Sequence, residues 1–249
     1  MILYTIRHAE SANNALYATT GSSAGRHPDP PLTERGHRQA ELLARHLAAP
    51  GRPGLTYHAE RHDRGGFHLT HLYSSLMVRA VITGSYIAEA TGLPLQAWTD
   101  IHERGGLHDV EPETGAEVGV PGPNRAWFAT AYPQLRLPDA LGEAGWWNRG
   151  REREDEFLPR ARAVWHQLLE RHGDSDDRVA IVTHGGFLHS LLTALLSPEG
   201  LPVPTHIGAT HLWFGASNAA ISRIEFREGV AAIRYLNRVD HLPSELLSA

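Results

Sequence analysis

The 249-residue chain contains no cysteine and no lysine, because all 23 of its basic side chains are arginines. Without cysteine, it cannot form a disulfide, a thiolate metal site or a cysteine nucleophile. Without lysine, it cannot be a P-loop kinase, a protein kinase or a Schiff-base enzyme, since each of these classes uses a lysine. The two absences therefore exclude several large classes of enzyme.

Charge and hydropathy argue against two further kinds of partner. The formal net charge is -5, whereas nucleic-acid-binding proteins usually carry a basic excess, so we expect no nucleic-acid partner. The sequence has no membrane-spanning run, and its apolar start, Ile2–Ile6, meets Arg7 too early for a signal peptide. We expect a cytoplasmic protein without a membrane partner. A homodimer is compatible with the sequence, which does not encode the oligomeric state.

Alternating apolar and amphipathic segments predict the fold class. Strands are expected at Ile2–Ile6, His71–Ser74, Leu95–Ile101, Val179–Val182, Ile221–Phe226 and Val230–Tyr235. Helices are expected after Thr33, from Val78 to Ala88, near Asn124–Ala131, from Phe157 to Leu169 and from Phe187 to Leu196. This order predicts an α/β protein: a three-layer α/β/α sandwich with a mainly parallel sheet and helices on both faces.

Two segments interrupt this order within the single domain that we expect over residues 1–249. Residues 50–68 are rich in Gly, His and Arg and are typical of a surface excursion. Residues 104–150 hold many Gly, Pro and Trp residues with little periodicity, which predicts a cap insertion. Within this cap, Trp146 and Trp147 fit packing and a wall of a substrate pocket equally well.

Polar side chains follow three of the predicted parallel strands. Arg7 and His8 follow the first strand, and Arg79 lies one turn into the helix after the second. His184 and Gly185 follow the fourth strand, Val179–Val182. Ligands of such sheets bind beyond the carboxyl ends of the strands, so we expect these residues to share one pocket. Arginine matches phosphate oxygens, and the N–H groups at the helix start after Gly185 can add donors. A neutral imidazole can attack phosphorus, and nearby guanidinium groups would keep His8 unprotonated, which predicts phosphoryl transfer at this pocket.

Short motifs in a fixed order extend this pattern over most of the chain. They are Arg7-His8-Ala9-Glu10-Ser11 with Asn14, Asp29-Pro30-Pro31-Leu32-Thr33 with Gly36 and Gln39-Ala40, Ser74-Ser75-Leu76 with Arg79-Ala80 and Thr83, Val182-Thr183-His184-Gly185-Gly186, and Asn218. As a set, they resemble the histidine phosphatase superfamily, also called phosphoglycerate-mutase-like.

The resemblance implies a role for each matching residue. His8 would be phosphorylated, Arg7, Arg79 and His184 would hold the transferring group, and Asn14 would be a further phosphate contact. Glu103, in the segment after the peripheral strand, would protonate the leaving group and later take a proton from the attacking water.

Two departures from the family pattern matter for these roles. Ala9 replaces the usual Gly beside the nucleophile, and Leu107 stands where the family has a Gly four residues after the acid. The second departure leaves Asp109, Glu111 and Glu113 as alternative acids.

The main hypothesis is a metal-independent phosphatase that acts on a small phosphorylated metabolite and needs no cofactor. A mutase of the phosphoglycerate type, which passes the phosphoryl group to a second hydroxyl, is the alternative. A non-catalytic phosphate-binding relative is the third reading. His58 and His62 have the spacing of a metal pair, but their polar surroundings favour a solvated loop, so we expect no metal site.

Overall fold

The computed structural model describes residues 1–52, 54, 56–197, 206–207 and 210–249. Its main sheet has seven strands in the order β11-β10-β1-β7-β2-β3-β6. These strands are β1 (Ile2–Arg7), β2 (His71–Ser74), β3 (Leu95–Ala97), β6 (Leu135–Arg136), β7 (Arg178–Thr183), β10 (Ile221–Arg227) and β11 (Val230–Arg238). Five neighbouring strands run parallel, and β10 and β11 add an antiparallel hairpin beside β1, which confirms the mainly parallel sheet.

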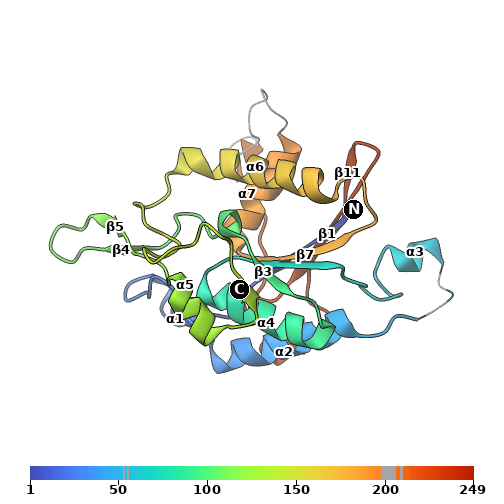
Figure 1. The fold of residues 1–249 in the computed structure, drawn as a ribbon, viewed down its shortest axis with the longest axis horizontal. Helices are drawn as coiled ribbons and strands as arrows, with labels where there is room; N and C mark the ends of the chain where they lie inside the picture. The colour runs from blue at the N-terminus through green and yellow to red at the C-terminus, as the bar shows by residue number, and fades with distance from the viewer. Residues whose placement is uncertain (53, 55, 198–205, 208–209) are drawn as a thin grey trace.

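Helices cover both faces of this sheet (Figure 1). One face carries α6 (Glu154–His172) and α7 (Gly185–Leu196), and the other carries α2 (Glu34–Ala48) and α4 (Val78–Thr91). Strand β1 is buried between the layers, with Leu3 facing the first helix pair and Tyr4 the second. The three-layer α/β/α sandwich predicted from the sequence is therefore confirmed.

The remaining elements are short. They are α1 (Ala12–Thr20), α3 (Tyr57–Glu60), α5 (Arg125–Ala131), the 3₁₀ helices Thr99–Ile101 and Ser244–Leu246, and the hairpins β4 (His108–Val110) with β5 (Glu117–Gly119) and β8 (His206–Ile207) with β9 (Thr210–His211). In the described part of the chain, no helix is both long and apolar enough to cross a bilayer.

Three local features differ from the sequence expectations. The third strand ends at Ala97 instead of Ile101, because its partner β2 ends at Ser74, and a 3₁₀ helix follows. Helix α1 was not predicted, since it buries no side chain and has no apolar face to reveal it. The 50–68 segment is not only a surface excursion.

This segment, 50–68, inserts Asp63 and Phe67 under the sheet. The Asp63 carboxylate accepts hydrogen bonds from the hydroxyls of Tyr4 at 2.5 Å and Tyr235 at 2.7 Å, and pairs with Arg223 at 2.6 Å. Buried polar groups need such partners, so this network docks the insertion on the face that carries α2.

The cap predicted over residues 104–150 holds elements of its own. The β4–β5 hairpin projects from one end of the molecule (Figure 1), while β6 pairs with β3 and extends the main sheet. Segment 104–150 thus contributes both a projecting hairpin and the edge strand of the sheet.

Candidate active site

His8 lies directly after β1, at the carboxyl edge of the sheet, and is 3% exposed. Its Nδ1 lies 2.7 Å from the carbonyl oxygen of Ala9, and its Nε2 accepts a hydrogen bond from Arg79 Nε at 3.1 Å. Because a carbonyl oxygen only accepts, we assign the ring proton to Nδ1 and the free lone pair to Nε2. Burial, followed by the charges of Arg79 and Arg7, holds the pKa of His8 well below its ordinary value. The imidazole is therefore neutral, and the lone pair on Nε2 faces the guanidinium of Arg79.

Arg79 is itself held by a buried carboxyl group. Asp29 Oδ1 lies 3.7 Å from a terminal nitrogen of Arg79 and accepts the backbone N–H of Val78 at 3.0 Å. Burial raises the pKa of Asp29 to about 6, against the lowering effect of Arg79. Sequence reasoning treated Asp29 as part of a turn and gave it no role, whereas here it orients the guanidinium beside His8.

His184 provides the second imidazole and caps the start of α7. Its ring centroid lies 5.1 Å from that of His8, and its Nε2 lies 3.0 Å from Ser75 Oγ. Its Nδ1 is buried and has no hydrogen-bond partner among the described residues. Burial first, then Arg79 and His8, keeps the pKa of His184 well below its ordinary value. The two neutral imidazoles of His8 and His184 thus lie beside each other at the carboxyl edge of the sheet.

Arg7 lies beside the first turn of α7. One of its terminal nitrogens donates to the carbonyl oxygen of Ala216, and its buried Nε has no partner in the described part of the chain. A Cβ placed on Gly185 would lie 3.5 Å from Arg7 Nε, so the helix start and the guanidinium are adjacent. Helix N-termini and guanidinium groups both bind anions, and here they can bind the same one.

Glu103 follows the 3₁₀ helix and reaches the same helix start. Its carboxylate accepts backbone N–H groups from Phe187 at 3.0 Å, Gly186 at 3.2 Å and its neighbour Arg104 at 2.8 Å. Burial lowers the pKa of Arg7, and the charge of Glu103 opposes this lowering, so the carboxylate lies close enough to act on the arginine pocket. The acid predicted from the resemblance is thus brought to this pocket.

Asn14 joins the group through an intermediate residue. Its Oδ1 accepts hydrogen bonds from Ser11 N–H at 3.1 Å and Asn218 Nδ2 at 3.3 Å. The same Asn218 nitrogen donates to the backbone carbonyl of His8 at 3.2 Å. Asn14 therefore lies one residue away from the His8 loop, and its contact with a phosphate remains a prediction.

Sequence reasoning missed His102, which lies behind Glu103. Its Nδ1 lies 2.7 Å from the Glu103 carbonyl oxygen, and burial lowers its pKa to about 3. Trp146 and Trp147 are buried against this ring, with centroids at 6.0 and 4.9 Å. The two tryptophans thus pack behind the segment that carries Glu103. No motif marks His102 in the sequence.

Other candidates from the cap lie elsewhere. Asp109, Glu111 and Glu113 are exposed on or beside the β4–β5 hairpin. Among the predicted acids, Glu103 is therefore the one that the structure brings to the arginine pocket.

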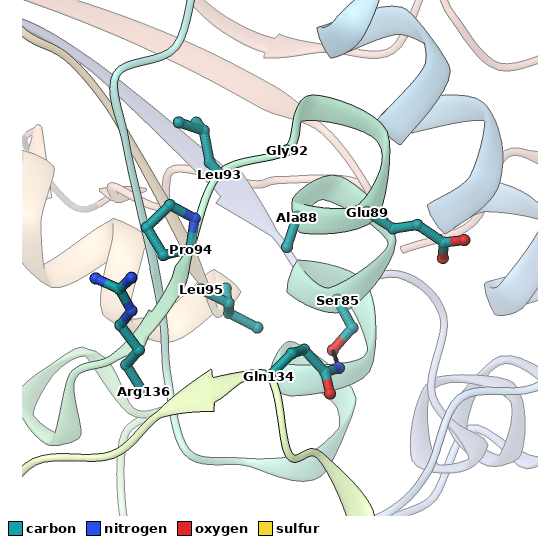
Figure 2. A pocket seen from close by; sticks show the side chains of 9 residues that line it. All are labelled: Ser85, Ala88, Glu89, Gly92, Leu93, Pro94, Leu95, Gln134 and Arg136. Atoms are coloured by element: carbon teal, nitrogen blue, oxygen red, sulfur yellow. Dashed lines mark hydrogen bonds between the residues drawn. The ribbon is translucent and has the colours of Figure 1, made fainter.

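A separate hollow of about 610 Å³ lies between α4, β3 and β6, at the end of α4 remote from Arg79 (Figure 2). It is lined by Ser85, Ala88, Glu89, Gly92, Leu93, Pro94, Leu95, Gln134 and Arg136. None of these residues belongs to the predicted site, so the hollow plays no part in the chemistry proposed below.

Comparison with known proteins shows which family the chain is similar to. The family model described as the histidine phosphatase superfamily, branch 1, matches residues 3–239. A probable phosphatase of Schizosaccharomyces pombe is 25% identical over 206 residues, covering 81% of this chain and 59% of that protein. The chain thus spans less than two thirds of the length of that relative. A glucosyl-3-phosphoglycerate phosphatase of Mycolicibacterium vanbaalenii is 27% identical over 208 residues, covering 81% of this chain and 75% of that protein.

Solved structures show the same fold. The mycobacterial glucosyl-3-phosphoglycerate phosphatase complexed with VO3 superposes with a TM-score of 0.55 at 20% identity. The alignment covers 96% of this chain and 99% of that one. At this identity, the similarity shows the fold alone. The function has to be argued from the site residues of this chain.

Proposed function

This chain belongs to the histidine phosphatase superfamily, and we propose that it hydrolyses small phosphate monoesters through a phosphoryl group carried on His8. One observation carries the proposal: His8 Nδ1 faces a carbonyl oxygen while Nε2 faces the guanidinium of Arg79. This arrangement supports a neutral nucleophile beside a group that stabilises transferring phosphate.

In the first step, the lone pair of His8 Nε2 attacks phosphorus, and the bond from phosphorus to the leaving oxygen breaks. The phosphoryl group takes the place of the hydrogen bond between Nε2 and Arg79 Nε. Arg7, Arg79 and His184 bind its equatorial oxygens, while the N–H groups of Gly186 and Phe187 hold Glu103 beside them. Glu103, in its protonated form, gives its proton to the leaving oxygen, so the product of this step is a neutral alcohol.

In the second step, water attacks the phosphorus of phospho-His8. Glu103 now takes a proton from this water, the bond from nitrogen to phosphorus breaks, and orthophosphate leaves. His8 regains the lone pair on Nε2, and Glu103 regains its proton, so both groups return to their starting states. Because two arginines supply the positive charge, the proposed reaction needs no metal ion.

The proposed substrate is a small phosphorylated metabolite. One relative is named for glucosyl-3-phosphoglycerate, and we propose a phosphate monoester of comparable kind for this chain. An assay with 3-phosphoglycerate, with and without bisphosphoglycerate, separates this proposal from the mutase alternative. Release of orthophosphate supports the phosphatase, and formation of the isomer supports the mutase.

The direct test is His8→Ala in a metal-free assay. We expect turnover to fall by roughly 10³-fold or more, because the covalent route is lost. The acid-labile phosphoenzyme should disappear as well. The control is His37→Ala on the exposed side of α2, which should keep normal turnover. Near-normal turnover in His8→Ala would show that the mechanism is wrong.

A further inference from the structure

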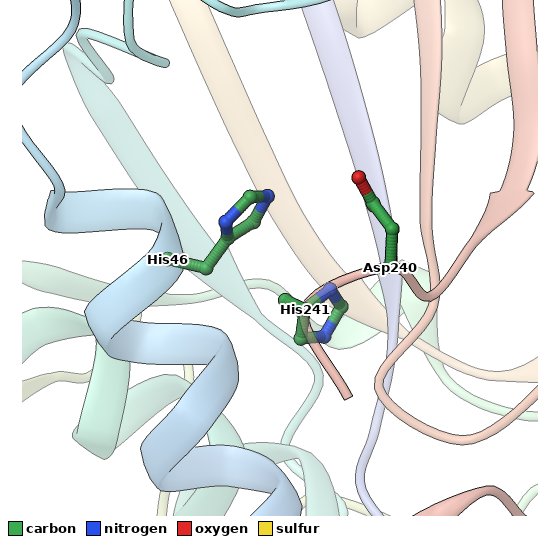
Figure 3. Close-up of side chains that lie close together, drawn as sticks. All are labelled: His46, Asp240 and His241. Carbon is green, nitrogen blue, oxygen red and sulfur yellow. The ribbon is translucent and has the colours of Figure 1, made fainter. Parts of the chain in front are cut away.

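A cluster of metal-binding side chains lies apart from the catalytic groups described above, between α2 and the segment after β11. His46 comes from the last turn of α2, and Asp240 and His241 follow β11 (Figure 3). Their donor atoms all lie within 4.8 Å of one another. Figure 3 shows the three side chains grouped around one space, reached from two elements that are far apart in the sequence.

The imidazole nitrogens of this cluster lack the partners that buried polar atoms normally have. His46 Nε2 and both ring nitrogens of His241 are shielded from solvent and make no hydrogen bond of good geometry with any described residue, although the backbone of Ala219 lies close enough to His241 to oppose the lowering of its pKa. The two rings are stacked, with centroids 5.1 Å apart and an angle of 16° between their planes. Such unpaired nitrogens cost free energy unless something binds them.

A second cluster gives a comparison within the same chain. His71, His172 and Asp177 also bring donor atoms within 4.8 Å. There, His172 Nδ1 bonds Asp177 at 2.9 Å and its Nε2 lies 3.1 Å from Tyr73 Oη, while His71 Nδ1 lies 2.9 Å from Thr70 Oγ1. That cluster is explained by its own hydrogen bonds, whereas the His46 cluster is not.

The carboxylate of the first cluster is oriented for a role as a ligand. Arg238 holds Asp240 with two hydrogen bonds, at 2.6 and 2.8 Å, which leave other lone pairs on both oxygens. A second group that orients a ligand, as Arg238 does, is typical of metal sites.

We propose that His46, Asp240 and His241 form a binding site for a divalent transition metal of the zinc class. Two imidazoles and one carboxylate favour Zn²⁺ over Mg²⁺ or Ca²⁺, which prefer oxygen ligands. Bonds of about 2.0–2.1 Å place tetrahedral donors roughly 3.3 Å apart, so the two stacked rings would rotate on metal binding until both in-plane lone pairs point at one ion. The exposed Asp240 leaves room for water as the fourth ligand.

Such a metal would fasten the C-terminal segment to α2. The same segment bonds Gln39 of α2 through the carbonyl oxygen of Leu246 at 2.7 Å, and Ser248 bonds Asn218 at 3.1 Å. Asn218 in turn contacts the backbone of His8. The proposed role is structural, and the chemistry at His8 does not pass through the metal.

The test uses the full chain without a histidine tag and Zn²⁺ as the probe. In competition with a chromogenic chelator, we expect one equivalent to bind. His46→Gln and His241→Gln should each bind at least about 100-fold more weakly, since even the loss of a group that only orients a metal ligand costs 10–100-fold. The matched control is His71→Gln in the second cluster, which should bind as the wild type does.

A thermal unfolding series supplies a second readout. At a metal concentration 100 times its Kd, the Tm of the wild type should rise by roughly 5–10 °C, and that of His46→Gln should not rise. Asp240→Asn, at an exposed position, serves if either histidine variant fails to fold, and should weaken binding at least about tenfold. The proposal is overturned if the wild type does not compete with the chelator, or if His46→Gln and His241→Gln bind as tightly as His71→Gln.

Discussion

At the residue scale, the reactivity of His8 depends on two neighbours that act on opposite sides of its ring. The Ala9 carbonyl oxygen fixes the proton on Nδ1, and Arg79 opposes a second proton on Nε2. Ala9 accepts this hydrogen bond through its backbone, so replacing the usual Gly with Ala leaves the acceptor in place. The departure from the family pattern at this position therefore removes no group that the chemistry needs.

The role of Glu103 can be tested through the leaving group. Glu103→Gln keeps the shape of the side chain but cannot supply a proton, so turnover of alkyl phosphates should fall by about 10²–10⁴-fold. An aryl phosphate, whose leaving group needs little protonation, should lose much less. Steady-state kinetics with a matched pair of substrates measures the difference. Equal losses on both substrates would rule out Glu103 as the leaving-group acid.

At the element scale, the start of α7 carries several functions at once. Its N-cap is His184, its first residue lies beside Arg7, and the N–H groups of Gly186 and Phe187 bind Glu103. Glycine at position 186 is required by close approach, since a Cβ there would lie 2.3 Å from a carboxylate oxygen of Glu103.

We therefore expect Gly186→Ala to displace Glu103 without unfolding the chain. Turnover of alkyl phosphates should fall by roughly 10²-fold, the usual effect of a misplacement of about 1 Å, with a smaller loss on aryl phosphates. Gly150→Ala is the control, because a Cβ at that glycine meets no atom within 4 Å. If both alanine variants keep wild-type kinetics, the contact between Gly186 and Glu103 does not position the acid.

At the scale of the whole molecule, buried neutral histidines set the response to acid. Burial lowers the pKa values of three buried imidazoles in the folded state: His8, His102 and His184. In the unfolded chain, their pKa values return to about 6.5. Below that pH, the unfolded state binds more protons than the folded state, so acid favours unfolding.

The free energy of unfolding should therefore fall as the pH drops from about 6.5 towards 4, by up to ~1.4 kcal/mol per pH unit for each such histidine. The contribution of Asp29 to the free energy of unfolding has the opposite sign. Its pKa is about 6 in the folded state, so between about pH 4 and 6 the folded state keeps a proton that the unfolded state has released. One carboxyl group offsets only part of the effect of the histidines. Urea unfolding at a series of pH values measures this slope, and a flat profile from pH 6.5 to 4.5 would contradict it.

The sequence by itself determined the layered fold and the residues that gather at the candidate active site. Periodicity located the buried strands and amphipathic helices, because burial on one or two faces constrains residue types along the chain. The residues of the candidate site were identified because they lie just after strands of a parallel sheet, or one turn into the helix that follows. Such strand ends share one edge of the sheet, and the residues there are Arg7, His8, Arg79 and His184. Helix α1 escaped detection because it has no buried face to leave a pattern.

Only the tertiary structure decided which groups support these residues. These supporting contacts join residues that are distant in sequence or that belong to no motif. They are the contacts of Asp29 with Arg79, His102 with the Glu103 carbonyl, Asp63 with Tyr4, and His46 with His241. Such pairs depend on how elements pack across layers, and packing leaves no local period in the sequence. A pattern along the chain can predict where a strand ends, whereas the partner that it meets there is set by the arrangement of the whole fold in space.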